Sequence, residues 1–443
     1  MTGTAQHDVL IIGAGLAGLQ AAVVLAEAGL DVQVLEASDA VGGRQRTDII
    51  DGFRLDRGFH VLNPAYRSVR RWADVRKLRL QAFPAGVQVR RGAASEPDAA
   101  DASRLVTLAD PRRQPLSIPA SVRSGLLDPP ELLALARWAM PALLAPRALR
   151  KRAAAGSDRT VRQAWDDVGP RGRLRTEVLE TFLSGVLADG RFDTSDAYVR
   201  WLVRLFAQGT PGLPVEGIQA LPEQLAASAR SAGARILLGQ RVTRMHARLD
   251  RVEVEVADAD AASAAAVVVA VGAEHLTGLT ALAAPATRGL QTWWFAPADP
   301  PLPSGMLAVD GRRHGPIVNT AVISHAAPSY APAGRHLVQA TCLLPADAAP
   351  GEGEVRRQLG EIWGTDATRW PLLRRDDIRH ALPAQPPPLR PAPARAGARM
   401  YVAGDHRESP SIEGALVSGE RAARILLADR AAVNHSPHVT SGA

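Results

Sequence analysis

Three glycines near the N-terminus have the spacing of a phosphate-binding turn. Gly13, Gly15 and Gly18 follow an apolar stretch at residues 8–12, which predicts a buried strand, and they open a helical pattern over residues 14–28. In such a turn the first glycine allows a sharp bend, the second lets the backbone approach a pyrophosphate, and the third lets the helix pack on the strand. The helix N-terminus offers free N–H groups to the phosphates. The pattern predicts a dinucleotide site that includes the intervening Ala14, Leu16 and Ala17.

The residues after the second predicted strand, 32–35, extend this site. Glu36 follows the glycines by about 20 residues, the spacing at which a carboxylate binds the ribose hydroxyls of a nucleotide. A carboxylate at this point repels a 2′-phosphate, so NADP is disfavoured. A few residues later the chain can return to the pyrophosphate with bare backbone and guanidinium groups, which bind phosphate oxygens well. The residues concerned are Ala37, Gly42, Gly43, Arg44 and Arg46.

Four stretches together resemble the flavoprotein superfamily of amine oxidases, phytoene and squalene desaturases and protoporphyrinogen oxidase. The first is the glycine-rich region just described, and the second is DGFRLDRGFH at residues 51–60. The third runs from PVEG at 214–217 through Val242 to the strand that ends at 270–272. The fourth is YVAGD at 401–405 with IEGALVSG at 412–419. The resemblance implies FAD as a non-covalent cofactor, with further contacts from Gly58, Phe59, His60, Val242, Val271, Gly272, Gly404, Asp405, Ile412, Glu413 and Ala415.

The resemblance also implies a two-domain α/β fold, which suits a chain of 443 residues. We expect a Rossmann-type FAD-binding domain, discontinuous in sequence and built from residues 1–75, 207–285 and 395–432. Residues 76–206 and 286–394 are expected to form an α+β substrate-binding domain, with a mixed sheet and a helical cap. Residues 433–443 are polar and are predicted to form a flexible tail.

The amino-acid composition limits the classes of binding partner that the sequence predicts. The net charge is +7, but almost all basic residues are dispersed arginines, and aromatic residues make up only 4%, so a nucleic-acid surface is not predicted. Cys342 is the only cysteine, which excludes an internal disulfide, a CxxC redox pair and a cysteine-based metal site. The polar N-terminal residues and the lack of a long apolar run predict a cytoplasmic protein. The apolar segment 119–150 suits either a lipid-facing entrance or core helices, and a homodimer stays open.

Candidate catalytic residues follow from the same stretches. His60 matches a family position near the flavin ring, and His406 lies in the loop after Asp405, so either imidazole could orient substrate or move a proton. A packed histidine without a chemical role is the alternative for both. Trp293 and Phe295 lie on a predicted strand of the substrate domain and could line the substrate pocket, although a core strand explains them nearly as well. No metal site is predicted.

Three functions remain open at this point. The amino-acid sequences of the two C-terminal stretches resemble the desaturases more than the amine oxidases. This resemblance favours an FAD-dependent oxidoreductase that transfers a hydride from a small, largely apolar substrate to flavin N5. An amine oxidase with O2 as acceptor is less favoured, because many such members of the superfamily use a lysine on a substrate-domain strand and no lysine follows Lys151 here. A redox-neutral flavin-dependent isomerase is the third. The electron acceptor of the first, O2 or a quinone, is not indicated by the residues.

Overall fold

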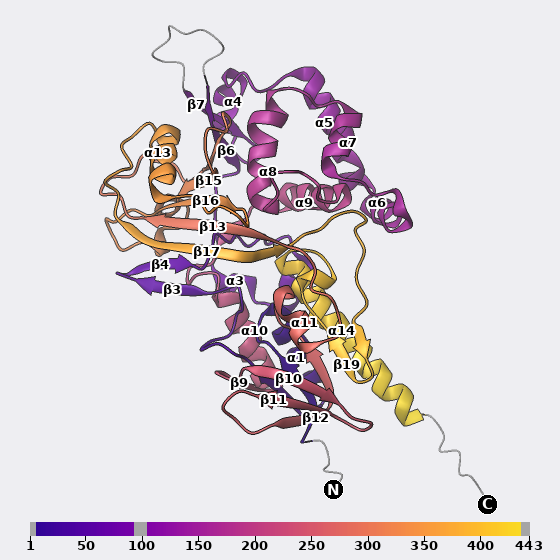
Figure 1. The fold of residues 1–443 in the computed structure, drawn as a ribbon. Helices are drawn as coiled ribbons and strands as arrows, with labels where there is room; N and C mark the ends of the chain where they lie inside the picture. The colour runs from indigo at the N-terminus through magenta and orange to yellow at the C-terminus, as the bar shows by residue number, and fades with distance from the viewer. Residues whose placement is uncertain (1–5, 93–103, 436–443) are drawn as a thin grey trace, which may run out of the picture.

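The computed structural model describes residues 6–92 and 104–435 and consists of two large sheets with helices around them (Figure 1). The first sheet lies in the lower half of the view, with the long C-terminal helix beside it. The second sheet lies above it, next to a group of helices. The predicted α/β architecture is therefore confirmed. Of the predicted tail, residues 433–435 instead end a helix, and residues 436–443 lie outside the described residues.

The first sheet contains the strand–helix–strand unit predicted around the glycines. Its strands run in the order β10-β11-β12-β1-β2-β9, and β19 joins at β12 and carries β18. β12 pairs in parallel with both β1 and β19, so the ends of these strands meet at one edge of the sheet. The bounds are β1 His7–Ile12, β2 Val32–Leu35, β9 Arg235–Leu237, β10 Val242–Ala247, β11 Val252–Val256, β12 Ala262–Val269, β18 Arg395–Gly397 and β19 Met400–Val402.

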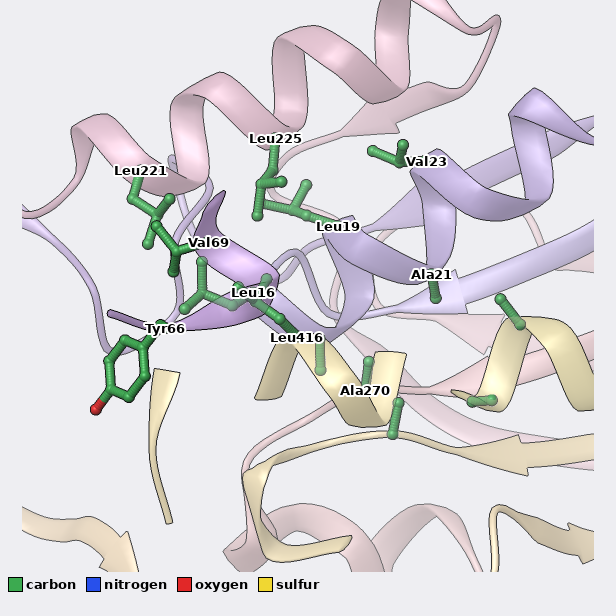
Figure 2. Close-up of a cluster of buried hydrophobic side chains, with 14 of the residues drawn as sticks. Leu16, Leu19, Ala21, Val23, Tyr66, Val69, Leu221, Leu225, Ala270 and Leu416 are labelled. Carbon is green, nitrogen blue, oxygen red and sulfur yellow. The ribbon is translucent and has the colours of Figure 1, made fainter. Parts of the chain in front are cut away.

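One face of this sheet is covered by α1 (Leu16–Glu27), which packs between α10 (Ala220–Ser231) and α14 (Ile412–His435). Burying an apolar face against a neighbour supplies most of the stability of such helices. Leu16 and Leu19 of α1 are buried and lie near Leu225 of α10 and Leu416 of α14 in one cluster (Figure 2). Segments more than 180 residues apart in sequence are thereby held around the N-terminus of α1.

The second sheet is mixed, with the order β17-β13-β16-β15-β14-β6-β7; all neighbours are antiparallel except β14 and β6. The helix α13 (Glu352–Trp363) packs on one of its faces, where Trp293, Phe295 and Cys342 belong to the same buried cluster as Leu359. The other face is turned toward α8. The bounds are β6 Gly86–Arg91, β7 Arg104–Ala109, β13 Thr287–Phe295, β14 Leu307–Asp310, β15 Ile317–Val322, β16 Val338–Leu344 and β17 Leu372–Pro383.

A helical block occupies most of the region between β7 and the return to the first sheet. Its helices are α4 Ile118–Arg123, α5 Pro129–Leu144, α6 Pro146–Arg152, α7 Val161–Val168, α8 Glu180–Leu187 and α9 Asp196–Gln208. Two π-helical stretches, Ala153–Ser157 and Leu174–Leu179, interrupt the series. The block packs internally on an edge-to-face pair, Trp138 against Trp165, with ring centroids 5.7 Å apart. It matches the helical cap expected from the sequence.

The remaining α-helices and strands are short, and most of them lie in the connections between the two sheets and the cap. They are β3 Thr47–Ile50, β4 Phe53–Asp56, α2 Arg67–Trp72, α3 Val75–Leu78, β5 Gln81–Ala82, β8 Gly212–Leu213, α11 Leu276–Leu279 and α12 Ile323–Ala326. All strands of the first sheet fall within the three segments assigned above to an FAD domain, and all strands of the second fall within the other two. This distribution supports the proposed division, whose exact residue limits stay a prediction.

Candidate active site

The glycine turn is built by close backbone approach. Gly13 adopts φ +102°, and a Cβ there would lie 2.7 Å from the carbonyl oxygen of Ala270 on the neighbouring strand connection. A Cβ on Gly18 would lie 2.0 Å from the oxygen of Gly13. Neither position can carry a side chain without a shift of the backbone. Gly15, in contrast, has ordinary dihedral angles, φ −74° and ψ 177°, and a Cβ there would meet no atom within 4 Å.

The absence of neighbours at Gly15 indicates which way the turn faces. Gly15 is the N-cap residue of α1, and a glycine offers no side chain to cap this helix end. Its position lines a cavity, so a side chain added there would enter open space rather than the protein core. Uncapped N–H groups beside such a space suit a phosphate. The turn therefore fits the dinucleotide expected from the sequence.

Glu36 is held in place by the same turn. Its Oε2 atom accepts a hydrogen bond from the backbone N–H of Ala14 at 2.6 Å, and its Oε1 atom accepts from the N–H of Ser38 at 2.9 Å. Each carboxylate oxygen can accept more than one hydrogen bond. Because Glu36 also lines the cavity with Ala37, it keeps lone pairs for the hydroxyl groups of a ribose.

The two arginines expected at the pyrophosphate differ in their surroundings. Arg44 lines the cavity, and its guanidinium donates to Asp405 Oδ2 at 2.7 Å and to the carbonyl oxygen of Ala381 at 2.6 Å. Burial would lower the pKa of Arg44, but the ion pair with Asp405 outweighs it and raises the pKa. Arg46 is buried, donates to Asp39 Oδ1 at 3.0 Å and does not line the cavity. Only Arg44 is therefore placed to reach a ligand directly.

The C-terminal stretch reaches the same cavity through Gly404, Asp405, Ile412 and Ala415. Glu413, in the first turn of α14, is directed elsewhere: its carboxylate accepts the backbone N–H of Ser68 at 2.9 Å, and it does not line the cavity. Its function in this structure is to join α14 to the start of α2. Burial raises the pKa of Glu413, against which the hydrogen bonds of Ser68 act.

The two candidate histidines lie in different places. His60 lines the cavity beside Gly58, and its Nε2 atom lies 3.1 Å from the carbonyl oxygen of Arg57. Burial lowers the pKa of His60, which favours the neutral ring. The side chain of His406 is only 1% exposed and does not line the cavity. Burial lowers the pKa of His406 to about 4. His60 stays a candidate for a place near the reaction, whereas the position of His406 outside the cavity counts against a catalytic role for it.

Trp293 and Phe295 also do not line the cavity, although the sequence offered them as substrate contacts. Side chains alternate along a strand, and on β13 these two point to the face covered by α13, where they stack on each other with ring centroids 6.3 Å apart. The alternate residues Leu290 and Thr292 line the cavity instead. These two residues lie on a strand, as expected, and their side chains belong to the core, which was the alternative to a pocket wall.

The glycine turn, Glu36, Arg44 and His60 all line one cavity, whose volume is about 1620 Å³. This exceeds the ~300–1,000 Å³ of most ligand pockets and leaves room for a second molecule beside a dinucleotide. The predicted residues that line it are Gly13, Gly15, Leu16, Ala17, Glu36, Ala37, Gly42, Gly43, Arg44, Gly58, Phe59, His60, Val242, Val271, Gly272, Gly404, Asp405, Ile412 and Ala415. Those that do not are Ala14, Gly18, Arg46, Glu413, His406, Trp293 and Phe295.

The far part of the cavity is mainly apolar and comes from the cap and the second sheet. Its walls include residues that sequence patterns did not assign to a site: Val87, Leu108, Leu174, Val178, Phe182, Val186, Leu202, Leu205, Phe206, Leu290 and Leu307. A helical pattern over residues 198–206 is visible in the sequence, but it does not distinguish a pocket wall from a packed core. Only the folded arrangement shows that these side chains surround a space continuous with the glycine turn.

A family model described as flavin containing amine oxidoreductase matches residues 16–427. The chain belongs to this family. It is an FAD-dependent oxidoreductase of the amine oxidase and desaturase superfamily, with a Rossmann-type FAD domain. The fit of the glycine turn, Glu36 and the cavity to a dinucleotide agrees with FAD as its cofactor.

Individual relatives resemble only short parts of the chain in sequence. It is 45% identical to a carotenoid 3,4-desaturase of Haloarcula japonica over 58 residues, 13% of this chain and 12% of the relative. It is 48% identical to a putrescine oxidase of Kocuria rosea over 59 residues, again 13% and 12%. The crystal structure of an oxidoreductase from Methanosarcina mazei is 18% identical, with a TM-score of 0.71 over 94% of this chain and 99% of that one. The last likeness shows the fold alone.

We predict that Gly15→Val abolishes FAD retention without unfolding the protein. The valine side chain would enter the space expected for the pyrophosphate, whereas the backbone angles and the empty surroundings tolerate it. The measurement is the flavin-to-protein absorbance ratio after gel filtration, with circular dichroism to check folding. Gly351→Val is a matched control, because Gly351 is also a helix N-cap in extended conformation (φ −85°, ψ 153°) without neighbours within 4 Å and lies outside the cavity. A folded Gly15→Val protein that keeps its full complement of FAD would contradict the assignment.

Proposed function

We propose that this chain oxidises a small, largely apolar organic substrate by hydride transfer to the flavin, in the manner of a desaturase. The observation that carries the proposal is the continuity of the cavity, which joins the glycine turn and Glu36 to the apolar walls of the cap and the second sheet. FAD, when bound, supplies N5 as a hydride acceptor. The specific substrate belongs to the proposal and not to the family assignment.

The residues of the chain contribute binding, orientation and exclusion of water. Apolar side chains such as Leu205 and Phe206 exclude water from the far part of the cavity and give an apolar substrate a favourable surface. His60 lines the cavity next to Phe59, and burial lowers its pKa, which favours the neutral ring. A neutral imidazole there can accept or donate one hydrogen bond to the substrate without adding a charge.

The lysines favour a desaturase over an amine oxidase. Lys77 and Lys151 are the only lysines of the sequence, and neither belongs to the residues that line the cavity. On β13, where the resemblance places the lysine of many amine oxidases, the residues that line the cavity are Leu290 and Thr292. Amine oxidation with O2 and redox-neutral isomerisation stand as the alternative reactions. O2 and a quinone stand as the candidate electron acceptors.

The desaturase proposal predicts which compounds reduce the flavin. Mixed anaerobically with the yellow protein, a panel of isoprenoids with and without oxygen substituents should bleach the flavin absorbance, whereas alkyl amines should not. Bleaching by amines alone would contradict the proposal and favour the oxidase. Product formation only after reduction by NADPH, without net consumption of an acceptor, would assign the isomerase. Re-oxidation of the bleached protein by O2 or by a quinone then identifies the acceptor.

We also infer that FAD is held without a covalent bond. Cys342 lies on the α13 face of the second sheet, is fully buried in that cluster, and is separated from the cavity by the sheet itself. Burial raises the pKa of its thiol, which keeps it protonated and unreactive. Precipitation of the holoprotein with acid should therefore release all of the flavin into the supernatant. Yellow colour that stays with the protein pellet would contradict this inference.

Peripheral contact with a membrane is a further part of the proposal. No single helix within residues 6–92 and 104–435 is long and apolar enough to span a bilayer; the helices at Pro129–Leu144 and Pro146–Ser157 meet that test only as a pair, with a bend of 97°. Most exposed large apolar side chains of the described residues fall between positions 116 and 144: Leu116, Ile118, Val122, Leu132, Leu133, Met140 and Leu144. Exposed arginines on α4 and α5, such as Arg123 and Arg137, suit anionic lipid headgroups.

The membrane proposal predicts co-sedimentation with vesicles that contain phosphatidylglycerol, and weaker binding to pure phosphatidylcholine. Leu133→Glu combined with Leu144→Glu should reduce the bound fraction several-fold, because both side chains are exposed on α5, by 52% and 75%. Leu249→Glu is the matched control, since Leu249 is fully exposed in the turn between β10 and β11 on the other sheet. Equal sedimentation of the wild type, the double variant and Leu249→Glu would count against membrane contact through the cap.

A further inference from the structure

The wall that the second sheet gives to the cavity contains a row of polar side chains among apolar neighbours. Thr292 of β13 stands opposite Thr341 of β16, which stands opposite Asn319 of β15, and Gln339 lies two residues before Thr341 on the same face. All four are nearly or fully buried, with exposures of 0–5%. Thr292 and Asn319, at the two ends of the row, line the cavity.

Hydrogen bonds within the row fix the orientation of Asn319. The hydroxyl of Thr341 donates to Gln339 Oε1 at 3.0 Å, and Gln339 Nε2 donates to Asn319 Oδ1 at 3.0 Å. The amide oxygen of Asn319 is thereby occupied, and its Nδ2 group is turned the other way. No hydrogen bond donated by Nδ2 is found among the described residues, and Asn319 borders the cavity. Thr292 Oγ1 is buried without a partner.

A buried O–H group without a partner is unfavourable, so Thr292 Oγ1 requires an explanation, and the amide N–H group of Asn319 beside the cavity also lacks an acceptor. Close packing leaves Asn319 little freedom to turn away. A Cβ on Gly185 of α8 would lie 2.5 Å from Asn319 Nδ2, which means that the helix backbone already touches the amide on that side. The cavity is the remaining direction in which the amide can find an acceptor.

We propose that Asn319, oriented by Gln339 and Thr341, donates a hydrogen bond to an oxygen atom of the substrate, and that Thr292 provides a separate hydroxyl at the other end of the row. The substrate is then an elongated apolar molecule with one carbonyl or hydroxyl oxygen, rather than a bare hydrocarbon or an amine. This inference rests on the proposed function, whose apolar substrate it makes more specific. Gln339 and Thr341 act through Asn319 and are positioning residues.

The N–H donors of Asn319 indicate which polar group the substrate has, an oxygen atom that accepts hydrogen bonds or an amine. An ammonium group has only donors, and it would meet the N–H donors of Asn319 without a partner for either. A carbonyl oxygen has only acceptors and matches them. A bare hydrocarbon would leave the amide unpaired, so it should bind more weakly than a ketone of the same chain length.

The test measures ligand binding to the FAD-loaded protein and needs no turnover. The probes are 2-dodecanone, dodecane and dodecylamine, and the readouts are the perturbation of the flavin absorbance band and titration calorimetry. The ketone should bind roughly three- to tenfold more tightly than the hydrocarbon, the range expected for one buried hydrogen bond. Asn319→Asp, which keeps the shape but replaces the donor by an acceptor, should remove the advantage of the ketone and improve binding of the amine.

Two further variants separate orientation from packing. Thr341→Val removes the hydroxyl that holds Gln339 and should lower the affinity for the ketone about two- to threefold, with no change for dodecane. Leu290→Ala, at an apolar part of the wall, should weaken the ketone and the hydrocarbon to the same degree. Equal affinity of wild type for ketone and hydrocarbon, or preference for the amine, would overturn the inference and leave the proposed function standing. Failure of all three probes to bind would instead count against an apolar substrate.

Discussion

Close backbone contacts at glycine positions hold together the nucleotide end of this molecule, by which we mean the glycine turn of the first sheet and the helices packed around it. Gly18 places α1 against the turn at Gly13, and Gly419 places α14 against α1, since a Cβ there would lie 2.2 Å from the carbonyl oxygen of Ala17. The N-terminus of α1 can point into the cavity only because both contacts are made without side chains. The leucine cluster around Leu16 and Leu416 then supplies the apolar energy that keeps the three helices in this arrangement (Figure 2).

Where the two sheets meet, a buried carboxylate holds separate segments of the chain together. Asp56, at the end of β4, accepts hydrogen bonds from Thr47 Oγ1 at 2.6 Å, from the N–H of Ile218 at 3.1 Å and from the hydroxyl of Tyr330 at 2.9 Å. These partners come from three separate parts of the chain. Burial raises the pKa of Asp56 to about 6, while the three hydrogen bonds act in the opposite direction. The segment that leads to Gly58 and His60 therefore starts from a fixed point, which determines where His60 meets the cavity.

The sequence predicted the parts of the site that depend on backbone pattern and missed those that depend on packing. The glycine turn and the position of Glu36 follow from local rules, because a turn of this kind allows few residue types. The orientation of Trp293 and Phe295 depends on which face of the second sheet α13 covers, and no local pattern contains that information. His406 directly follows Asp405, yet its ring turns into the protein while Asp405 reaches the cavity. The apolar wall could not be predicted either, because a helix that lines a pocket and a helix in a core have the same periodicity.

One guanidinium connects the two halves of the cavity. Arg44 donates to Asp405 on the nucleotide side and to the carbonyl oxygen of Ala381 on β17, a strand of the second sheet. Its two terminal nitrogens donate to these two different acceptors, and because the guanidinium is planar and rigid, the distance between the acceptors can vary little. The same strand contributes Ile378 and Leu382 to the cavity wall, and its neighbour β13 contributes Thr292. The position of the polar row relative to the nucleotide end is thus set through Arg44, so that an oxygen bound at Asn319 would fix how far the rest of the substrate extends toward His60.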